Sequence, residues 1–198
     1  DPWLTSFASP EGSVSGFGRP GATDMTALPD LSIRALREAD LPAYKALRDH
    51  ALAHHEEAFT SDAPTEALRA AASYAGRLGG DGSDSFTLGA FRGDQLVGAI
   101  TCERDPRSKV RHIGHLVGTM VHADEMRRGV GGALLDALIA RAAADDELQQ
   151  LTLTVTAGND AAERLYARAG FVHYGTLPRA IRVGGRLLDK HHMVLNLR

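Results

Sequence analysis

Residues 126–135 read Met-Arg-Arg-Gly-Val-Gly-Gly-Ala-Leu-Leu, and this stretch decides the fold. It follows a strand-like run that ends at Val121, and it opens an apolar segment over residues 129–144 whose spacing is helical. Glycine lets the backbone approach a ligand closely, and the first N–H groups of a helix have no partner within the helix. A basic, glycine-rich turn at the start of a helix is therefore typical of a phosphate-binding site.

Two common phosphate-binding turns do not fit this stretch. It lacks the Gly-Lys-Ser/Thr ending of a nucleoside triphosphate loop. A dinucleotide-binding fold requires Gly-x-Gly-x-x-Gly after the first strand of the domain, with an acidic residue about 20 positions later. Here several strand-like runs precede the turn, and its third glycine is misplaced.

A second motif follows the turn after one helix and one strand. Residues 151–155 (Leu-Thr-Leu-Thr-Val) form an alternating β-type run, and a short helical segment over residues 160–168 comes next. Asn159 and Tyr166 lie seven positions apart in this segment, which ends in Gly170-Phe171.

Both motifs, in this order, resemble those of the GNAT N-acetyltransferase family over residues 116–171. The resemblance implies an α/β fold: a mixed, mostly antiparallel central sheet of about six to seven strands, with helices on both faces and a splay between the two central strands. It also implies an acyltransferase that moves an acetyl group from acetyl-CoA directly to a primary amine of a small molecule or peptide. The order of strands and helices extends this resemblance to one domain over residues 30–198.

The resemblance also assigns groups to the co-substrate acetyl-CoA. The pyrophosphate would bind the backbone amides of the turn, which belong to Arg127, Arg128, Gly129, Val130, Gly131 and Gly132. The pantetheine arm would contact the Asn159 side chain and pair with the backbone of Thr119, Met120 and Val121. Tyr166 would contact the coenzyme and protonate the departing thiolate as general acid.

Three positions depart from the family pattern. Met126 stands where the family has Arg or Gln, which removes a side-chain donor but leaves the backbone amides in place. Ala123 replaces a common proline, and Thr154 occupies the position where some members have a catalytic glutamate. The general base must therefore lie elsewhere or be water.

Glu103, at the end of the strand beside the expected cleft, is the preferred candidate for this base. His112 and His115 on the next strand are alternatives, because an imidazole can deprotonate an amine near neutral pH. The structural alternatives are an ion pair of Glu103 with Arg104 or Arg111, and ordinary surface or core positions for the histidines.

The acceptor pocket should involve the first two helices and the loop between them. Glu56, Glu57 and Asp62 in that loop would attract a cation, which slightly favours a polyamine-like, amino-sugar or basic peptide acceptor. Exposed charges around a helix end are an equally good interpretation. Two alternative functions stay open: a non-catalytic acyl-CoA-binding regulatory module, and an enzyme that uses a longer donor such as succinyl-CoA.

Composition narrows the class of protein further. The chain has 198 residues and a formal net charge of −3, with 22 Lys and Arg against 25 Asp and Glu, so no basic excess indicates nucleic acid. The single cysteine, Cys102, lies in a strand-like run where packing is expected, and it favours a reducing, cytoplasmic compartment. No apolar run approaches the roughly 20 residues of a membrane span. The abundance of Ala, Arg and Gly suggests a bacterial source.

The histidines do not indicate a metal site. His54-His55 and His191-His192 are adjacent pairs without the spacing of metal ligands, so no metal is expected. A homodimer through the terminal strands is compatible with the sequence, which does not itself show one.

The segment before residue 30 is rich in Gly, Pro, Ser and Thr, so residues 1–29 are expected to be a flexible extension or an expression-derived segment. Elsewhere the pattern predicts strands at 31–36, 86–91, 95–102, 110–121, 151–155, 171–177 and 187–197. It predicts helices from a cap at Asp40 to about 57, from a cap at Asp62 or Thr65 to about 78, at 129–144 and at 160–168.

Overall fold

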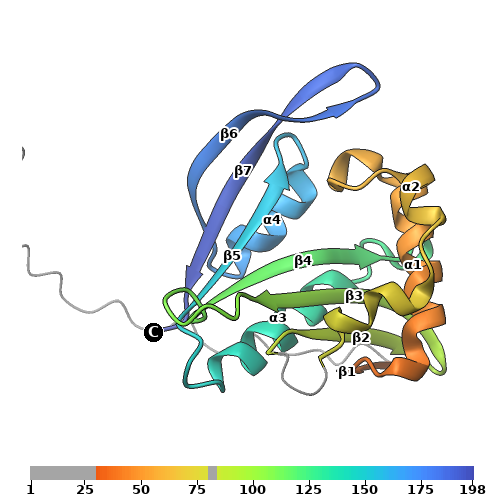
Figure 1. Cartoon of the computed structure of the whole chain (residues 1–198), viewed down its shortest axis with the longest axis horizontal. Helices are drawn as coiled ribbons and strands as arrows, with labels where there is room; N and C mark the ends of the chain where they lie inside the picture. Colours follow the sequence, from red (N-terminus) through yellow and green to blue (C-terminus); the bar gives the residue numbers. More distant parts are fainter. Residues whose placement is uncertain (1–29, 80–83) are drawn as a thin grey trace, which may run out of the picture.

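A computed structural model describes residues 30–79 and 84–198, so the expectation for residues 1–29 lies outside the described part. The described strands form one sheet in the order β1-β2-β3-β4-β5-β7-β6 (Figure 1). Their bounds are β1 Leu31–Ala35, β2 Phe86–Arg92, β3 Gln95–Arg104, β4 Ile113–Val121, β5 Gln150–Thr156, β6 Val172–Val183 and β7 Arg186–Asn196. Only β4 and β5 pair in parallel; every other described neighbour is antiparallel. The predicted mixed sheet is therefore confirmed.

The parallel pair β4–β5 separates after a short contact. Its register runs only from Ile113 opposite Gln150 to His115 opposite Thr152. Beyond that point the two strands diverge, as Figure 1 shows, so the edge of β4 that faces β5 is left without a strand partner. This is the splay that the resemblance implies.

A β-bulge at Gly118 bends β4 inside the splay. On the β3 side, Val117 pairs with Thr101 and Met120 pairs with Ala99, so two residues of β4 oppose one of β3. Gly118 has φ 59°, a backbone conformation that favours glycine. The bulge therefore needs the glycine that interrupts this strand in the sequence.

Helices cover both faces of the sheet. Helix α1 (Leu41–His54) packs against β3 and β4, whereas α3 (Val130–Ala143) packs against β2, β3 and β4. Helix α4 (Asp160–Arg168) follows β5, and α2 (Ala63–Ala67) packs on α1. Short 3₁₀ helices connect these elements: η1 Glu38–Asp40, η2 Glu56–Ala58, η3 Ala71–Arg77 and η4 Ala123–Glu125. None of the helices described is long and apolar enough to cross a membrane.

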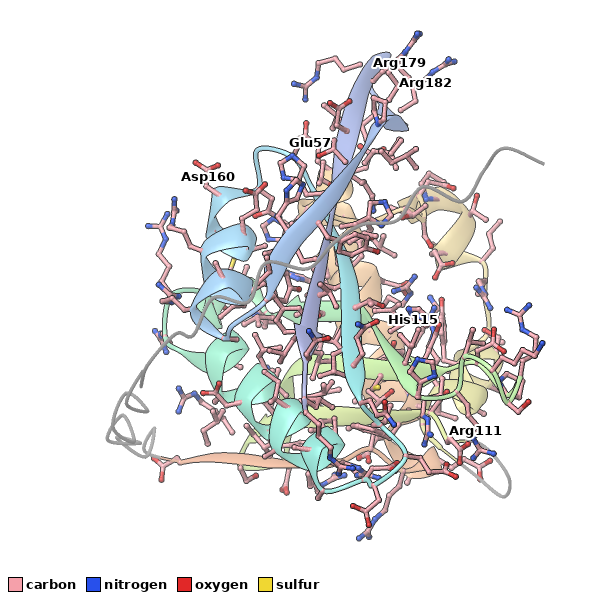
Figure 2. All side chains as sticks on the ribbon, turned by 90° about the vertical axis from the view of Figure 1, so that its left-hand side faces the viewer. Glu57, Arg111, His115, Asp160, Arg179 and Arg182 are labelled. Carbon is pink, nitrogen blue, oxygen red and sulfur yellow. The ribbon has the colours of Figure 1, made fainter. Side chains whose placement is uncertain are left out.

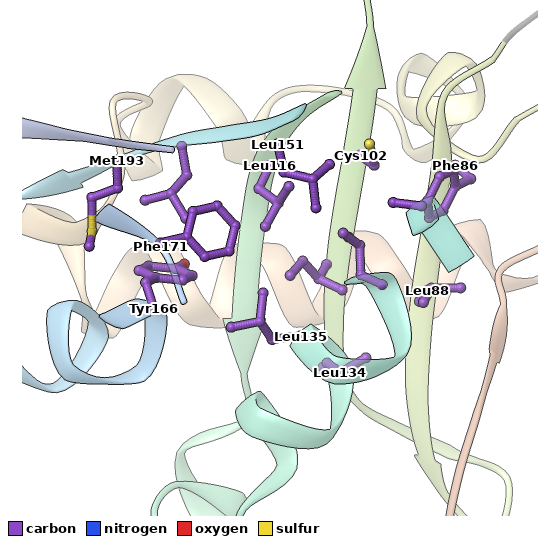
Figure 3. Packing of buried hydrophobic residues seen from close by; sticks show 14 of the residues in the cluster. Phe86, Leu88, Cys102, Leu116, Leu134, Leu135, Leu151, Tyr166, Phe171 and Met193 are labelled. Carbon is purple, nitrogen blue, oxygen red and sulfur yellow. The ribbon is translucent and has the colours of Figure 1, made fainter. Parts of the chain in front are cut away.

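Two hydrophobic clusters hold these layers together. The larger joins α3, through Leu134, Leu135 and Leu138, to the sheet and reaches Tyr166 and Phe171 (Figure 3). The smaller lies under α1 and includes Tyr44, Tyr74 and Met120. Cys102 is fully buried in the larger cluster, and burial raises the pKa of its thiol to about 12, so it is a packing residue as expected.

The predicted second helix is wrong in one respect, because it breaks at Ala70 into α2 and η3. Ala70 is extended, with φ −68° and ψ 146°. In an unbroken helix, Glu66 and Tyr74 would be separated by about 12 Å along the axis. The break instead lets the Tyr74 hydroxyl donate to the buried Glu66 carboxylate. Burying both side chains against α1 thus outweighs helix propensity.

Smaller differences concern the ends of elements. Helix α1 ends at His54 rather than near 57, and β4 begins at Ile113 rather than at 110. Asp40 does not cap α1; its carboxylate pairs with Arg34 (2.7 Å) and accepts from the Arg37 N–H. The side chain of Asp62, rather than Thr65, caps α2. Strand β6 continues to Val183 because it pairs with β7 along its length.

Candidate active site

The glycine-rich turn forms a cradle of backbone amides at the start of α3. Arg127 and Gly129 both have positive φ, 62° and 83°, which turns the chain sharply between η4 and the helix. The first helical hydrogen bond runs from the Ala133 N–H to the Gly129 carbonyl, at 3.0 Å. The amides of the three preceding residues, Val130 to Gly132, therefore lie before the hydrogen-bond ladder and remain available to an anion.

A cavity of about 570 Å³ opens in front of this cradle and is rimmed by cations. Its lining joins the turn to the face of α4 that carries Arg164, Leu165 and Arg168. A Cβ built at Gly131 would meet Leu165 no closer than 3.6 Å, so protein packing alone does not require this glycine. The space is instead suited to a ligand that approaches the backbone, and the arginines suit its negative charge. The residues present thus fit the phosphate end of coenzyme A.

The strand residues expected to hold the pantetheine arm lie at the inner edge of the splay. Met120 and Val121 pair with Ala99 and Gly98 of β3 on one side only, because β5 has already diverged on the other. The Met120 side chain is buried, so its backbone is what an extended ligand could reach. Val121 also lines the cavity in front of the cradle.

A second cavity, of about 240 Å³, lies on the other side of the splay, between β4 and the segment that connects α1 with α2. Thr119 of β4, Thr154 of β5 and Tyr166 of α4 line it. The two cavities share no lining residue, but both border the same short stretch of β4 and the same turn of α4. A donor in the first cavity and an acceptor in the second, which we call the acceptor cavity, would therefore meet near Thr119 and Tyr166.

Tyr166 brings a buried phenol to the second cavity. Its side chain is 7% exposed and packs edge-on against Phe171, with ring centroids 5.9 Å apart. Burial raises the pKa of the phenol, and a hydrogen bond with the Thr119 side chain acts in the opposite direction. The hydroxyl therefore keeps its proton at neutral pH.

Asn159 has a structural role at the start of α4. Its side-chain oxygen accepts from the Ala162 N–H at 3.2 Å and so caps α4. Asn159 lines a separate cavity beside residues 53–58 and the β6–β7 hairpin, not the cradle. Its contact with the pantetheine arm stays a prediction.

Of the base candidates, only Glu103 adjoins the acceptor cavity, through an arginine of its lining, whereas His115 lines a separate depression and His112 does not line the cavity. Glu103 forms an ion pair with Arg77 (Nε to Oε1, 3.0 Å), not with Arg104 or Arg111. His115 shares a hydrogen bond with the Thr152 hydroxyl at 2.6 Å. None of the described residues that line the cavity around Tyr166 is a carboxylate or a histidine.

Glu57 and Asp62 of the acidic loop have partners outside the acceptor cavity. Glu57 pairs with Arg186 of β7, and Figure 2 shows Glu57 beneath the hairpin that carries Arg179 and Arg182. Asp62 accepts from the Thr65 N–H at 2.9 Å. The charged residues that do line the acceptor cavity are cations, namely Arg48, Arg77 and Lys190. Sequence reasoning missed these three because they come from three distant elements and share no local motif.

Comparison with known proteins agrees with this geometry. Residues 44–171 match the family model described as the acetyltransferase (GNAT) family, and the chain belongs to this family.

Two relatives act on amino acids or their analogues, by their names. The L-methionine sulfoximine/L-methionine sulfone acetyltransferase of Pseudomonas paraeruginosa is 38% identical over 85 residues, which cover 40% of this chain and 49% of that protein. The L-2,4-diaminobutyric acid acetyltransferase of Streptomyces anulatus is 39% identical over 77 residues, which cover 38% of this chain and 44% of that protein. The chain thus spans about half the length of the curated relatives it matches.

A solved structure extends the similarity to the whole fold. The acetyltransferase of the GNAT family from Streptococcus pneumoniae superposes with a TM-score of 0.72 at 27% identity. The match covers 84% of this chain and 98% of that one.

Proposed function

We propose that the protein is an N-acetyltransferase that moves an acetyl group from acetyl-CoA to a primary amine of a small molecule. The observation that carries this proposal is the adjacency of two cavities along β4 and α4. One borders Val121 and Leu165 and suits an anionic donor, and the other, of about 240 Å³, borders Thr119 and Tyr166 and suits an acceptor. The small volume favours a small-molecule acceptor over a peptide. Family membership and the amine substrates named for the relatives support the same activity.

Each part of the chain has a defined task in this reaction. Acetyl-CoA, when bound, supplies an activated acetyl thioester. The amides from Arg127 to Gly132 hold its phosphates, except that of Arg128, which donates to the Glu125 carbonyl at 3.4 Å. The backbone from Thr119 to Val121 orients its arm in the splay. Holding both reactants in one geometry supplies much of the rate.

Proton movements complete the transfer. The amine nitrogen bonds to the acyl carbon while the carbon–sulfur bond breaks, and Tyr166 gives its phenol proton to the leaving sulfur. The proton lost by the amine goes to water, or to Glu103 at the margin of the cavity. The phenol then regains a proton from solvent, so no covalent enzyme intermediate forms.

Acceptor-dependent release of free coenzyme A thiol tests this function directly. We expect release from acetyl-CoA with some members of a panel of amino acids, amino sugars and polyamines. Binding of acetyl-CoA without thiol release for any amine would favour the non-catalytic module. A higher kcat/KM with succinyl-CoA than with acetyl-CoA would favour the longer donor.

We further propose a bacterial, cytoplasmic protein that requires neither metal nor nucleic acid and forms a homodimer. The relatives named above are bacterial, and the buried thiol of Cys102 suits a reducing compartment. The formal net charge of −3 speaks against a nucleic-acid partner. Exposed apolar side chains on β6, Val172 and Tyr174, support the dimer.

A further inference from the structure

Lys190 is a buried cation without a countercharge in the described part of the chain. It lies on β7 opposite Thr156 of β5, is 8% exposed and points into the acceptor cavity. Its ammonium donates to the Thr60 hydroxyl at 2.9 Å and forms no ion pair with any described residue. Buried charges are normally paired, because removing an ion from water is costly. Burial lowers the pKa of this lysine, because its charged form lacks compensation. A bound anion beside the ammonium would supply that compensation.

The two arginines of the cavity differ in how fully their guanidinium groups are paired. Arg48 is matched by Glu66, with which it forms a buried ion pair at 2.7 Å. Arg77 uses its Nε for Glu103, but its buried Nη1 has no hydrogen-bond partner among the described residues. That Nη1 lies 3.9 Å from the position that a Cβ on Gly118 would take, which places it directly at the bulge in β4.

These two donors share one small cavity with the reacting groups. Lys190, Arg77, Thr119 and Tyr166 all line the same 240 Å³. The described lining contains no carboxylate, and although Glu103 pairs with Arg77 from outside it, the charge of Lys190 stays unmatched. The cavity thus carries a net positive charge. It would repel a diamine and attract a molecule with an anionic group only a few bonds from its amine.

We propose that the acceptor is a small amino acid or a close analogue, and that Lys190 and Arg77 bind its carboxylate while its amine faces Thr119 and Tyr166. This inference rests on the proposed acetyltransferase function. It replaces the polyamine-like, amino-sugar or basic peptide acceptor that the acidic loop suggested, because none of the three carboxylates of that loop lines the cavity.

Matched acceptors test the recognition of a carboxylate. Thiol release from acetyl-CoA would be measured with the common L-amino acids and L-methionine sulfone, each beside its α-carboxamide, and with putrescine and glucosamine. The carboxamide has the less basic amine, so more of it is neutral at pH 7, and intrinsic reactivity favours the amide. We therefore expect each accepted acid to be the better substrate, with kcat/KM at least about 10- to 100-fold above that of its matched amide.

Substitutions test whether Lys190 and Arg77 bind the carboxylate of the acceptor. Lys190→Met should lower kcat/KM for the acid about 10- to 100-fold while leaving the rate with the amide nearly unchanged, so the preference collapses. Arg77→Met should act in the same direction, and Lys190→Arg should restore part of the preference. Lys109→Met, the same change at an exposed site outside the cavity, should leave the preference intact.

The opposing outcomes are distinct. Better turnover of an amide, putrescine or glucosamine than of any acid would overturn the inference. So would a Lys190→Met variant that loses acid and amide turnover equally with a shifted pH profile, since that result makes Lys190 a general base. Binding of acetyl-CoA without acetylation of any acid also overturns it, whereas failure to bind acetyl-CoA overturns the proposed function itself.

Discussion

At the scale of single residues, Tyr166 belongs both to the hydrophobic core and to the site of the proposed reaction. It contributes its ring to the larger hydrophobic cluster and its hydroxyl to the acceptor cavity. Because burial raises the pKa of the phenol, the group is a poor base and a persistent acid near neutral pH.

We predict that Tyr166→Phe lowers kcat by about 100-fold or more, the usual contribution of a positioned acid. Phenylalanine keeps the contact with Phe171 and adds no volume, so the melting temperature should change little. Steady-state kinetics and thermal unfolding of the same preparation separate the two effects. Unchanged turnover would remove Tyr166 from the mechanism.

Gly131 allows the cradle to be tested apart from stability. A Cβ there would make ordinary contacts with Leu165 at 3.6 Å and Val121 at 3.7 Å, and alanine is favoured over glycine within a helix by about 1 kcal/mol. Gly131→Ala should therefore fold at least as stably as the wild type. It should bind acetyl-CoA about tenfold more weakly, because the methyl group occupies the approach to the amides. Undiminished affinity by calorimetry would place the phosphates elsewhere.

At the scale of elements, the segment between α1 and α2 is hydrogen-bonded to strands β5 and β7. Thr156 of β5 donates to the Glu57 carbonyl at 2.6 Å, and Lys190 of β7 donates to Thr60 at 2.9 Å. Glu57 also pairs with Arg186 near the turn of the β6–β7 hairpin. These contacts close the acceptor cavity over the diverging strands.

The buried network around Glu66 fixes α2 and η3 on α1, and it makes a pH-dependent prediction. Burial alone would raise the pKa of Glu66, but hydrogen bonds from Tyr74 and Arg48 outweigh it and hold the pKa at about 2. A depressed carboxyl pKa stabilises the fold above the unfolded value, near 4.5, and this contribution is lost as the pH falls toward 2. Glu66→Gln should therefore lower the unfolding free energy at neutral pH by about 3 kcal/mol, since it leaves the Arg48 charge buried and unpaired.

Urea unfolding at several pH values measures this effect. The difference in unfolding free energy between the wild type and Glu66→Gln should decrease steadily below about pH 4.5, because only the wild type has a carboxyl group at position 66 that takes up a proton. A gap that stays constant as the pH is lowered would show that Glu66 is not ionised in the folded state. Lys109→Met, a change at an exposed side chain, serves as the control that should leave stability unchanged at every pH.

Sequence and structure agree best where local pattern determines the element. The cradle could be predicted from the residues Arg127 to Gly132, because a phosphate-binding turn is built from consecutive backbone groups. The break at Ala70 could not be predicted from local sequence, since it depends on the contact between Glu66 and Tyr74 across two elements. Lys190 is equally hidden, because only the folded sheet brings β7 beside the loop that carries Thr60.

At the scale of the whole molecule, the sheet separates two entrances. The cradle opens beside α3 and α4, and the acceptor cavity opens beside α1 and α2. Both cavities border β4 next to the place where it diverges from β5 (Figure 1). This arrangement supports the proposed direct transfer without a covalent enzyme intermediate.

The far edge of the sheet carries the prediction of a dimer. Val172, Tyr174 and Leu177 of β6 are 65%, 60% and 53% exposed, and Tyr174 borders an apolar depression over β5 and β7. We expect a dimer in sedimentation velocity at micromolar concentration, and a shift toward monomer for Tyr174→Glu. A wild-type protein that stays monomeric at the highest soluble concentration would contradict this.

Calorimetric titration with acetyl-CoA tests the central claim most directly. We predict micromolar, one-to-one binding that is weakened by Gly131→Ala and unaffected by Lys190→Met, because the cradle and the acceptor cavity are separate sites. The absence of heat with acetyl-CoA, free coenzyme A and succinyl-CoA would contradict the account. In that case the amides at the start of α3 do not form a coenzyme site, and the acetyltransferase assignment would fall with them.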